Sequence, residues 1–326
     1  MLEHGGNLRL ARQRYGGDDW IDLSTGINPH GYPAPLVADH AWHRLPEADP
    51  ALVDAACALY GAPFMLAVAG TQAAIQTLPR LRAPARVTVA APSYAEHAHH
   101  WAAHGHAVSL VPYTELDAAV AHSDVVVLCN PNNPTGATIA APQLLAWAAV
   151  LAARGGSLVI DEAFADTAPH NSIAACAAQP GIIVLRSIGK FFGLAGIRVG
   201  FVAAEPLLLN RLADALGPWT ISGPAQQIAI TALCDQAWQQ QTRASLTAAG
   251  ERLHALLAQA GIAATGTPLF QWWAHGEPEA FQRHMAERHL WVRLFQHAAR
   301  GIRLGLPADE DGWQRLHTAL YDWTNR

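Results

Sequence analysis

The chain contains one lysine, Lys190, among its 326 residues, whereas the other 20 of its 21 Lys and Arg residues are arginine. Either residue type supplies surface charge and ion pairs, but only the lysine amine can lose its proton and condense with an aldehyde. A single retained lysine therefore indicates a chemical role, most simply formation of a Schiff base. The alternative is a chance survivor in an arginine-preferring composition, and the residues around Lys190 must decide between the two.

Two pairs of residues have the chemistry to hold a phosphate group. Gly70 and Thr71 follow an expected strand and open a helix, so backbone N–H groups and a hydroxyl offer a seat for an anion. Ser187 and Arg198 flank Lys190 and could bind the same anion through a hydroxyl and a bidentate guanidinium. The first pair alone is a weak signal, because many strand-to-helix turns have this composition.

Three further residues follow expected strands and could hold a flat cofactor. Asp161 ends an apolar strand, where a carboxylate needs a cationic partner, either a protonated pyridine nitrogen or an arginine. Asn133 lies in a turn that two prolines and a glycine make rigid, which would aim its amide at a ligand. Tyr94 could stack on a cofactor ring, although ordinary core packing explains an aromatic residue there equally well.

Short β-branched runs alternate along the chain with alanine-rich stretches of helical periodicity. This alternation predicts an α/β fold with a mostly parallel central sheet and helices on both faces. Ligands of such folds gather at the carboxyl ends of the strands. The strands expected for this sheet are Phe64–Val68, Arg86–Ala90, Val108–Val111, Val125–Cys129, Leu158–Ile160, Ile182–Arg186 and Val199–Ala203.

The pattern changes near residue 224, where a long helical stretch runs to about residue 260. Two strand-like pieces follow it, Leu269–Ala274 and Ile302–Leu304, with helices between and after them. We therefore expect a large cofactor-binding domain over residues 36–240 and a smaller α+β domain over residues 241–326. Residues 1–35 show little periodicity, so we expect an arm that contributes to the active site and the small domain without forming a core element.

Together these motifs resemble the fold-type I pyridoxal-phosphate enzymes, the family of aspartate-aminotransferase-like proteins, over nearly the whole chain. The resemblance implies that pyridoxal 5'-phosphate is the cofactor and forms its Schiff base with Lys190. It further implies that Asp161 pairs with the pyridinium nitrogen, that Asn133 hydrogen-bonds the phenolic oxygen and that Tyr94 stacks on the ring. The cofactor phosphate would be held by the two pairs described above, Gly70, Thr71, Ser187 and Arg198.

Two other positions bear on what the resemblance implies. Tyr60 matches a tyrosine that reaches the cofactor phosphate of the neighbouring subunit, which implies a homodimer with shared active sites. Phe164 departs from the pattern, because the family often has a tyrosine there whose hydroxyl bonds the cofactor oxygen. Asn133 would then act alone on that oxygen, and the electronic properties of the cofactor would differ from those in a typical transaminase.

The two ends of the chain resemble one branch of this family. His4–Asn7, Asp22–Pro29 and Gly301–Pro307 are similar to segments of the decarboxylases that act on L-threonine O-3-phosphate for cobalamin synthesis. The core motifs are shared with histidinol-phosphate aminotransferases, which remain the alternative. The resemblance implies a phosphorylated amino-acid substrate, with Arg303 at the position of the family's carboxylate-binding arginine. The residues that we expect to bind the substrate's phosphate and carboxylate are His4, Gly5, Gly6, Asn28, Arg293 and Arg303.

Composition limits the partners and the compartment. Hydrophobic residues make up 51% of the chain, as in a well-buried α/β protein, and the net charge of −5 offers no basic field for nucleic acid. We find no apolar run of membrane length and no segment of signal-peptide type. The four cysteines show no CxxC spacing and are expected to be reduced, so we expect a cytoplasmic protein without nucleic-acid or membrane partners.

Five histidines crowd the segment 97–106. Of these, His100 and His104 are four residues apart and could share a helical face as metal ligands. We expect Glu96 to point elsewhere on this helix, which leaves no convincing ligand set. The segment is therefore predicted to be a polar, partly exposed helix rather than a metal site.

Overall fold

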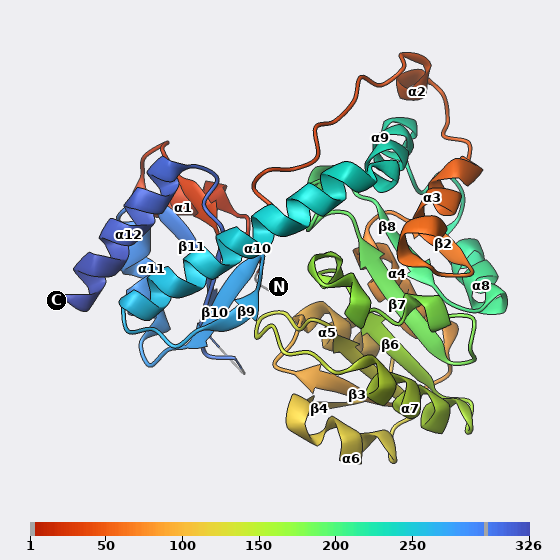
Figure 1. The fold of residues 1–326 in the computed structure, drawn as a ribbon. Helices are drawn as coiled ribbons and strands as arrows, with labels where there is room; N and C mark the ends of the chain where they lie inside the picture. The colour runs from red at the N-terminus through yellow and green to blue at the C-terminus, as the bar shows by residue number, and fades with distance from the viewer. Residues whose placement is uncertain (1–3, 297–298) are drawn as a thin grey trace.

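The computed structural model describes residues 4–296 and 299–326, which form a larger and a smaller part, each built on its own sheet (Figure 1). The strands are β1 (Ile21–Leu23), β2 (Met65–Val68), β3 (Arg86–Ala91), β4 (Ala107–Pro112), β5 (Val125–Cys129), β6 (Ser157–Asp161), β7 (Ile182–Ser187), β8 (Gly200–Ala203), β9 (Thr265–Thr267), β10 (Phe270–Ala274), β11 (Leu290–Phe295) and β12 (Gly301–Gly305). The larger sheet has the order β2-β8-β7-β6-β5-β3-β4, and the smaller has the order β1-β11-β12-β10-β9. In the larger sheet, only β8 runs antiparallel to its neighbours.

The helices cover both faces of the larger sheet and one side of the smaller one (Figure 1). They are α1 (Leu8–Tyr15), α2 (His40–His43), α3 (Pro50–Tyr60), α4 (Thr71–Thr77), α5 (Ala95–Ala103), α6 (Leu116–Val120), α7 (Ala141–Ala152), α8 (Pro206–Leu216), α9 (Gly223–Cys234), α10 (Gln236–Gln259), α11 (Pro278–Ala286) and α12 (Glu310–Thr324). Local signals fix their ends, as α3 illustrates. The Asp49 side chain accepts a hydrogen bond from the Ala51 amide at its start, and Gly61 ends it in the left-handed conformation.

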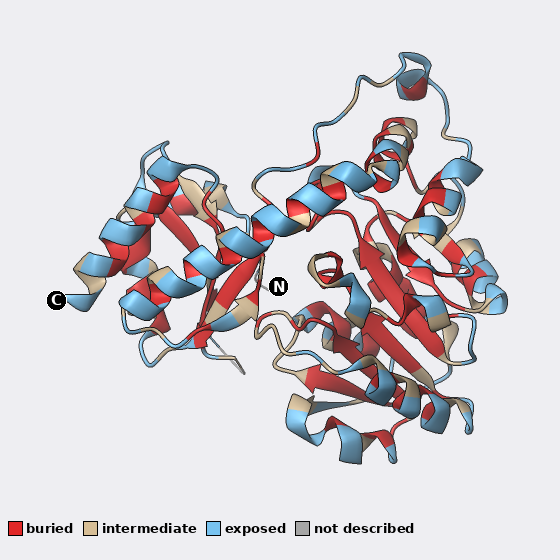
Figure 2. Cartoon of the chain, in the orientation of Figure 1, coloured by how far each residue is buried: buried red, intermediate tan, exposed pale blue. Residues whose placement is uncertain are grey.

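Strand β5 shows how the larger sheet forms the centre of its part. All five of its residues are buried, and alternate residues pack on opposite faces. Val126 and Leu128 belong to one apolar cluster, whereas Val125 and Val127 belong to another on the other face. A strand covered on both faces has an uninterrupted apolar sequence, because neither set of alternate side chains meets water. Figure 2 shows the same distribution, with buried strands beneath helices whose outer surfaces are exposed.

The larger sheet agrees closely with the prediction. All seven expected strands are present, and each end lies within one residue of its expected position. The two strand-like pieces expected near the C-terminus are β10 and β12. The prediction missed β9, which is only three residues long, and β11, which lies between the two expected pieces in a stretch that was predicted to be helical.

The expectation that the first 35 residues contain no core element is wrong. They include α1 and β1, and β1 pairs in parallel with β11 at one edge of the smaller sheet. Leu23 at the end of β1 is fully buried. A three-residue strand gives too short an alternation to recognise in a sequence, so its place depends on the partner strand. The expected boundary at residue 240 falls within α10, a continuous helix of 24 residues that joins the two parts (Figure 1).

None of the helices within residues 4–296 and 299–326 combines the length and the apolar character that crossing a bilayer requires.

Candidate active site

Lys190 lies just beyond the carboxyl end of β7, at the edge of the sheet where parallel strands present their ligands. Its side chain is half-buried, and its amine lies 5.7 Å from the centre of the Phe164 ring. Burial among protein atoms and the positive charges of Arg303 and Arg198 lower the pKa of Lys190 to about 8, against a smaller opposing effect of Asp161. At pH 7 about one tenth of the amine is therefore neutral, and this neutral form is the one that acts as a nucleophile.

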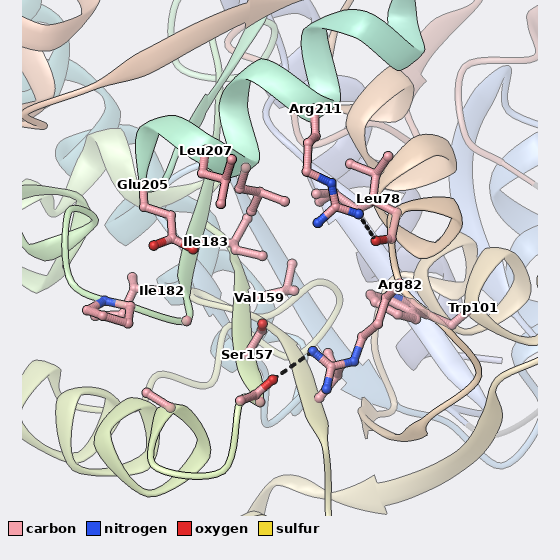
Figure 3. A pocket seen from close by; sticks show the side chains of 18 residues that line it. Leu78, Arg82, Trp101, Ser157, Val159, Ile182, Ile183, Glu205, Leu207 and Arg211 are labelled. Atoms are coloured by element: carbon pink, nitrogen blue, oxygen red, sulfur yellow. Dashed lines mark hydrogen bonds between the residues drawn. The ribbon is translucent and has the colours of Figure 1, made fainter.

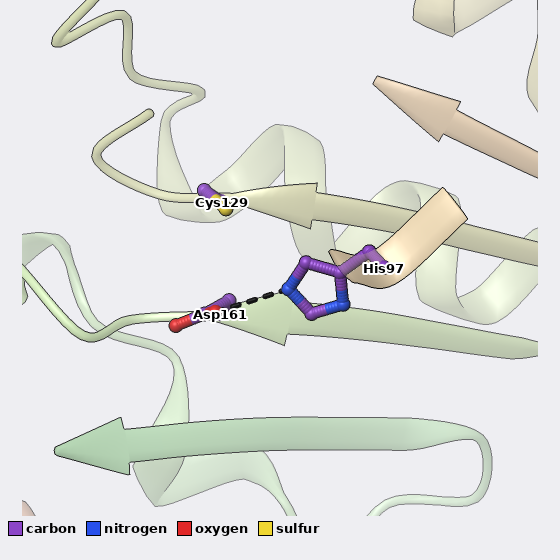
Figure 4. Close-up of side chains that lie close together, drawn as sticks. All are labelled: His97, Cys129 and Asp161. Carbon is purple, nitrogen blue, oxygen red and sulfur yellow. Dashed lines mark hydrogen bonds and ion pairs between the residues drawn. The ribbon is translucent and has the colours of Figure 1, made fainter. Parts of the chain in front are cut away.

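Asp161 ends β6 and is held by a buried histidine (Figure 4). Its Oδ2 lies 3.0 Å from Nε2 of His97 on α5, and its Oδ1 accepts a hydrogen bond from the Ala163 amide at 3.0 Å. Burial lowers the pKa of His97, but its hydrogen bonds to Asp161 and Cys129 outweigh that effect and raise it to about 10. His97 is thus a protonated donor at neutral pH, and its contact with Asp161 fixes the orientation of that carboxylate.

His97 was not predicted as a site residue, because it lies in the crowded histidine segment 97–106, which was predicted to be a polar, partly exposed helix. Its position one helical turn beyond Tyr94 was the available signal, since α5 starts directly after that residue. The ligand atoms of His97, Cys129 and Asp161 lie within 4.8 Å of one another, which is also compatible with a metal ion. The expectation for Glu96 is wrong, because its carboxylate lies 3.0 Å from Nε2 of His100.

Arg303 brings the smaller sheet into contact with the rigid Asn133 turn. One of its terminal nitrogens donates to the Asn133 side-chain oxygen, and the other donates to the Ser24 carbonyl at 2.8 Å. Arg303 is 7% exposed and lies directly opposite Arg293 in the antiparallel register of β11 and β12. Burial and the charge of Arg293 lower the pKa of Arg303 to about 9. Two arginines side by side on one face of a sheet form a site prepared for anions.

The residues expected to hold a phosphate come together around the start of α4. Gly70 caps this helix with a φ of 72°, and a Cβ at Gly70 would lie only 2.6 Å from an Arg198 guanidinium nitrogen. Glycine is therefore required both by the backbone conformation and by the close approach of Arg198. Thr71 is the first residue of α4, and the Ser187 hydroxyl accepts a hydrogen bond from the Gly189 amide at 3.2 Å.

The start of the chain reaches the same site. Nε2 of His4 lies 2.8 Å from the Glu96 carboxylate, and the His4 and Tyr94 rings have their centres 6.0 Å apart. Gly6 donates its amide to the Ser24 hydroxyl at 2.7 Å, and a Cβ at Gly5 would lie 2.4 Å from the Ser24 carbonyl oxygen. This close approach of two backbones explains why the segment contains glycine.

Asn28 and Tyr60, two further predicted residues, also contact other parts of the protein. Asn28 donates its amide to the Phe191 carbonyl at 2.9 Å, and its backbone amide donates to the Lys190 carbonyl, so it supports the loop that carries the lysine. Tyr60 packs its ring 4.2 Å from the Arg186 guanidinium. Its hydroxyl is buried, without a hydrogen-bond partner among residues 4–296 and 299–326, and burial raises its pKa. The predicted contact of Tyr60 with a neighbouring subunit stays a prediction.

A separate cavity of about 280 Å³ lies at the opposite edge of the larger sheet (Figure 3). It is lined by residues at the starts of β6 and β7, including Ser157 and Ile182, and by Arg82 and Arg211. Because Lys190 and Asp161 lie at the other ends of these strands, this cavity is not part of the site described above.

The residues present fit pyridoxal 5'-phosphate. An amine with a lowered pKa, a buried carboxylate held by a histidine, and an aromatic ring lie at one edge of the sheet, together with a glycine-lined turn beside an arginine. Arg303 also has a buried Nε without a partner among the described residues, as expected where an anionic ligand completes the site. Lys190 would hold the aldehyde, Asp161 the ring nitrogen, and Gly70, Thr71, Ser187 and Arg198 the phosphate.

Comparisons with known proteins agree with this reading. The sequence model of a family described as "Aminotransferase class I and II" matches residues 18–315. The chain is 50% identical over 323 residues to a threonine-phosphate decarboxylase of Pseudomonas aeruginosa, covering 98% of this chain and 97% of that protein. It is 44% identical over 334 residues to a protein of the same name from a Sinorhizobium species, covering 98% and 97%.

Among solved structures, a histidinol-phosphate aminotransferase from Sinorhizobium meliloti in complex with pyridoxal-5'-phosphate has the same fold. Its TM-score is 0.80 at 22% identity, with 99% of this chain and 95% of that chain covered. The predicted α/β fold and the family resemblance are confirmed. The chain belongs to the class I and II aminotransferase family, whose members are pyridoxal-phosphate-dependent enzymes.

Proposed function

We propose that the protein is a decarboxylase that converts L-threonine O-3-phosphate into (R)-1-amino-2-propanol O-2-phosphate and carbon dioxide for cobalamin synthesis. The observation that carries the proposal is the cross-strand pair of Arg293 and Arg303, of which Arg303 is close enough for its charge to lower the pKa of Lys190. A substrate with a carboxylate and a phosphate offers two anionic groups to this pair. The names of the Pseudomonas aeruginosa and Sinorhizobium relatives support the same reaction.

The bound cofactor would supply an electron sink for the electron pair left when the bond between the α-carbon and the carboxylate breaks. Asp161, fixed by His97, would keep a proton on the ring nitrogen. Carbon dioxide leaves, and the α-carbon gains one proton in its place. With a pKa of about 8, the Lys190 amine can hold that proton and deliver it at neutral pH.

Choice between decarboxylation and transamination depends on which bond of the α-carbon stands perpendicular to the cofactor ring. Arg303 lies where it can bind an anionic group of the substrate, because it contacts Asn133 and is buried beside the site. We assign His4, Gly5 and Gly6 to the second anionic group, with Arg293 as a further charged anchor. Asn28 would contribute through the lysine loop that it supports.

We also infer that the protein acts as a homodimer in the cytoplasm. The segment around α2 extends away from the larger part (Figure 1) and exposes Leu36, Trp42 and Leu45, which are 102%, 64% and 66% exposed. Large apolar side chains in such a segment suit burial against a second copy. All four cysteines are free, which supports a reducing compartment. Light scattering that gave the mass of a single chain would contradict the dimer.

The test of the proposed function is ³¹P and ¹H NMR of the pyridoxal-phosphate-loaded protein with L-threonine O-3-phosphate and no 2-oxo acid. We expect repeated turnover to 1-amino-2-propanol O-2-phosphate. A protein that leaves threonine phosphate intact, yet transfers the amino group of histidinol phosphate to 2-oxoglutarate, would be the alternative aminotransferase. The variant Arg303→Met removes the charge of Arg303. It should still bind the cofactor but lose turnover, and so serves as the inactive control.

A further inference from the structure

The Glu96 carboxylate, in the first turn of α5, holds side chains from three separate parts of the chain. It is 8% exposed, and its Oε2 accepts a hydrogen bond from Nε2 of Gln72 at 2.7 Å and lies 3.0 Å from Nε2 of His100. Its Oε1 lies 2.8 Å from Nε2 of His4. Burial raises the pKa of Glu96, but these three contacts outweigh burial and lower it. An ionised carboxylate only accepts hydrogen bonds, so both imidazoles donate to it.

The first branch of this network leads to the aromatic ring at the site. Gln72, the second residue of α4, accepts a hydrogen bond from the Tyr94 hydroxyl at 3.3 Å through its side-chain oxygen. Burial and the negative charge of Glu96 raise the pKa of Tyr94, so the phenol remains protonated and able to donate. Glu96 fixes the Gln72 amide in the orientation that presents its oxygen to Tyr94, since the amide nitrogen is committed to the carboxylate.

The second branch leads to the start of the chain. His4 is the residue through which the N-terminal arm, residues 4–7, contacts Glu96 of the larger part. The arm is joined to the smaller part, because Gly6 donates to the Ser24 hydroxyl and the Ser24 carbonyl accepts from Arg303. One carboxylate on α5 therefore touches both the arm and, through Gln72, the ring of Tyr94.

We propose that Glu96 is a positioning residue that couples the closed position of the N-terminal arm to the orientation of the Tyr94 ring. When His4 leaves Glu96, the carboxylate loses one of its three donors and holds the Gln72 amide less firmly. When the arm closes and His4 contacts Glu96, the orientation of the Tyr94 ring is fixed. The inference rests on the proposed function only in that Tyr94 is taken to face the cofactor; both measurements below proceed without substrate.

The experiment compares wild-type holoenzyme with Glu96→Gln, which keeps the shape of the side chain and removes its charge. The first readout is hydrogen–deuterium exchange at the amides of residues 5–7. We expect exchange to rise roughly fivefold, the upper range for a half-exposed ion pair. The second readout is the visible circular dichroism of the bound cofactor, which reports the asymmetry that its stacking ring imposes. We expect this band to lose part of its amplitude.

Three variants separate the two branches from general damage to the helix. His4→Ala should raise arm exchange and also reduce the dichroic band, because it removes both the contact with Glu96 and the ring contact with Tyr94. Tyr94→Phe should reduce the band, and combining it with Glu96→Gln should reduce it no further. His99→Ala is the matched control, since His99 is an exposed histidine of the same helix. It should leave both readouts at the wild-type values.

Unchanged arm exchange and an unchanged dichroic band in Glu96→Gln would overturn the proposal. A change in only one of the two readouts would also overturn it, because the branches would then be independent. Failure of the wild-type protein to decarboxylate threonine phosphate would contradict the proposed function and leave these results standing. The two failures are therefore distinguishable.

Discussion

The lowered pKa of Lys190 can be tested directly because the chain has a single lysine. A fall from 10.5 to about 8 corresponds to about 3 kcal/mol against the charged amine. Burial is the largest cause and the charge of Arg303 the next. At an effective dielectric constant of about 20, a repulsion worth about one pKa unit, roughly 1.4 kcal/mol, is that of two unit charges on the order of 12 Å apart, which is within the reach of charges that share one site. We therefore expect Arg303→Met to raise the pKa of Lys190 by about one.

The assay is ¹³C NMR of cofactor-free protein in which the lysine has been reductively methylated with ¹³C-formaldehyde. Lys190 gives the only lysine signal, and its shift against pH gives the pKa. Arg82→Met is the matched control, because Arg82 lines the cavity at the opposite edge of the sheet. It should leave the titration midpoint near 8.

The same shift has a consequence for stability. Between pH 8 and 10.5 the unfolded chain binds more protons at Lys190 than the folded chain does. The free energy of unfolding therefore rises with pH across this window by up to about 3 kcal/mol from this group. In the NMR titration, a wild-type Lys190 midpoint near pH 10.5 would contradict the lowered pKa. An Arg303→Met midpoint identical to that of the wild type would contradict the contribution of the Arg303 charge.

Three further predictions concern buried groups around the site. Arg186→Met should lower the free energy of unfolding in urea by about 3–5 kcal/mol, because it leaves Glu162 and Asp166 buried without their cation. Arg44→Met, which breaks the exposed pair of Arg44 and Glu47, is the control and should cost less than about 1 kcal/mol. Equal losses in the two variants would contradict the prediction for Arg186. His97→Gln should lower kcat for threonine phosphate by roughly 10–150-fold, the range for a hydrogen bond to a charged group, and a wild-type kcat would show that Asp161 needs no such support. Phe164→Tyr should shift the absorbance maximum of the bound cofactor, since position 164 faces the Lys190 amine, and an unchanged spectrum would place the ring outside cofactor contact.

Much of the site could be predicted because its residues follow strands that the sequence identifies well. Asp161 and Lys190 come directly after apolar runs, and the carboxyl ends of neighbouring parallel strands meet at one edge of the sheet. The positions of these side chains therefore follow from the chain order of strands and helices. The Gly70 turn follows from the same logic, since only glycine fits its backbone beside Arg198.

The contacts of α5 could not be predicted, because they depend on how the helix is rotated over the sheet. His97 faces Asp161, whereas Glu96 faces His4, and adjacent residues of a helix point about 100° apart. A segment with five histidines and no clear apolar stripe gives no basis for choosing that rotation. The position of β1 could not be predicted for a related reason. A strand of three residues is recognisable only from its pairing with a partner, here β11.

Decarboxylation of L-threonine O-3-phosphate by this protein is tested most directly by tracing the substrate's carboxyl carbon. L-Threonine O-3-phosphate labelled with ¹³C at the carboxylate is incubated with the loaded protein, and the label is traced by ¹³C NMR. We expect the label to appear as bicarbonate, one for each molecule of 1-amino-2-propanol O-2-phosphate formed. Label retained in a 2-oxo acid, with the amino group transferred elsewhere, would contradict it.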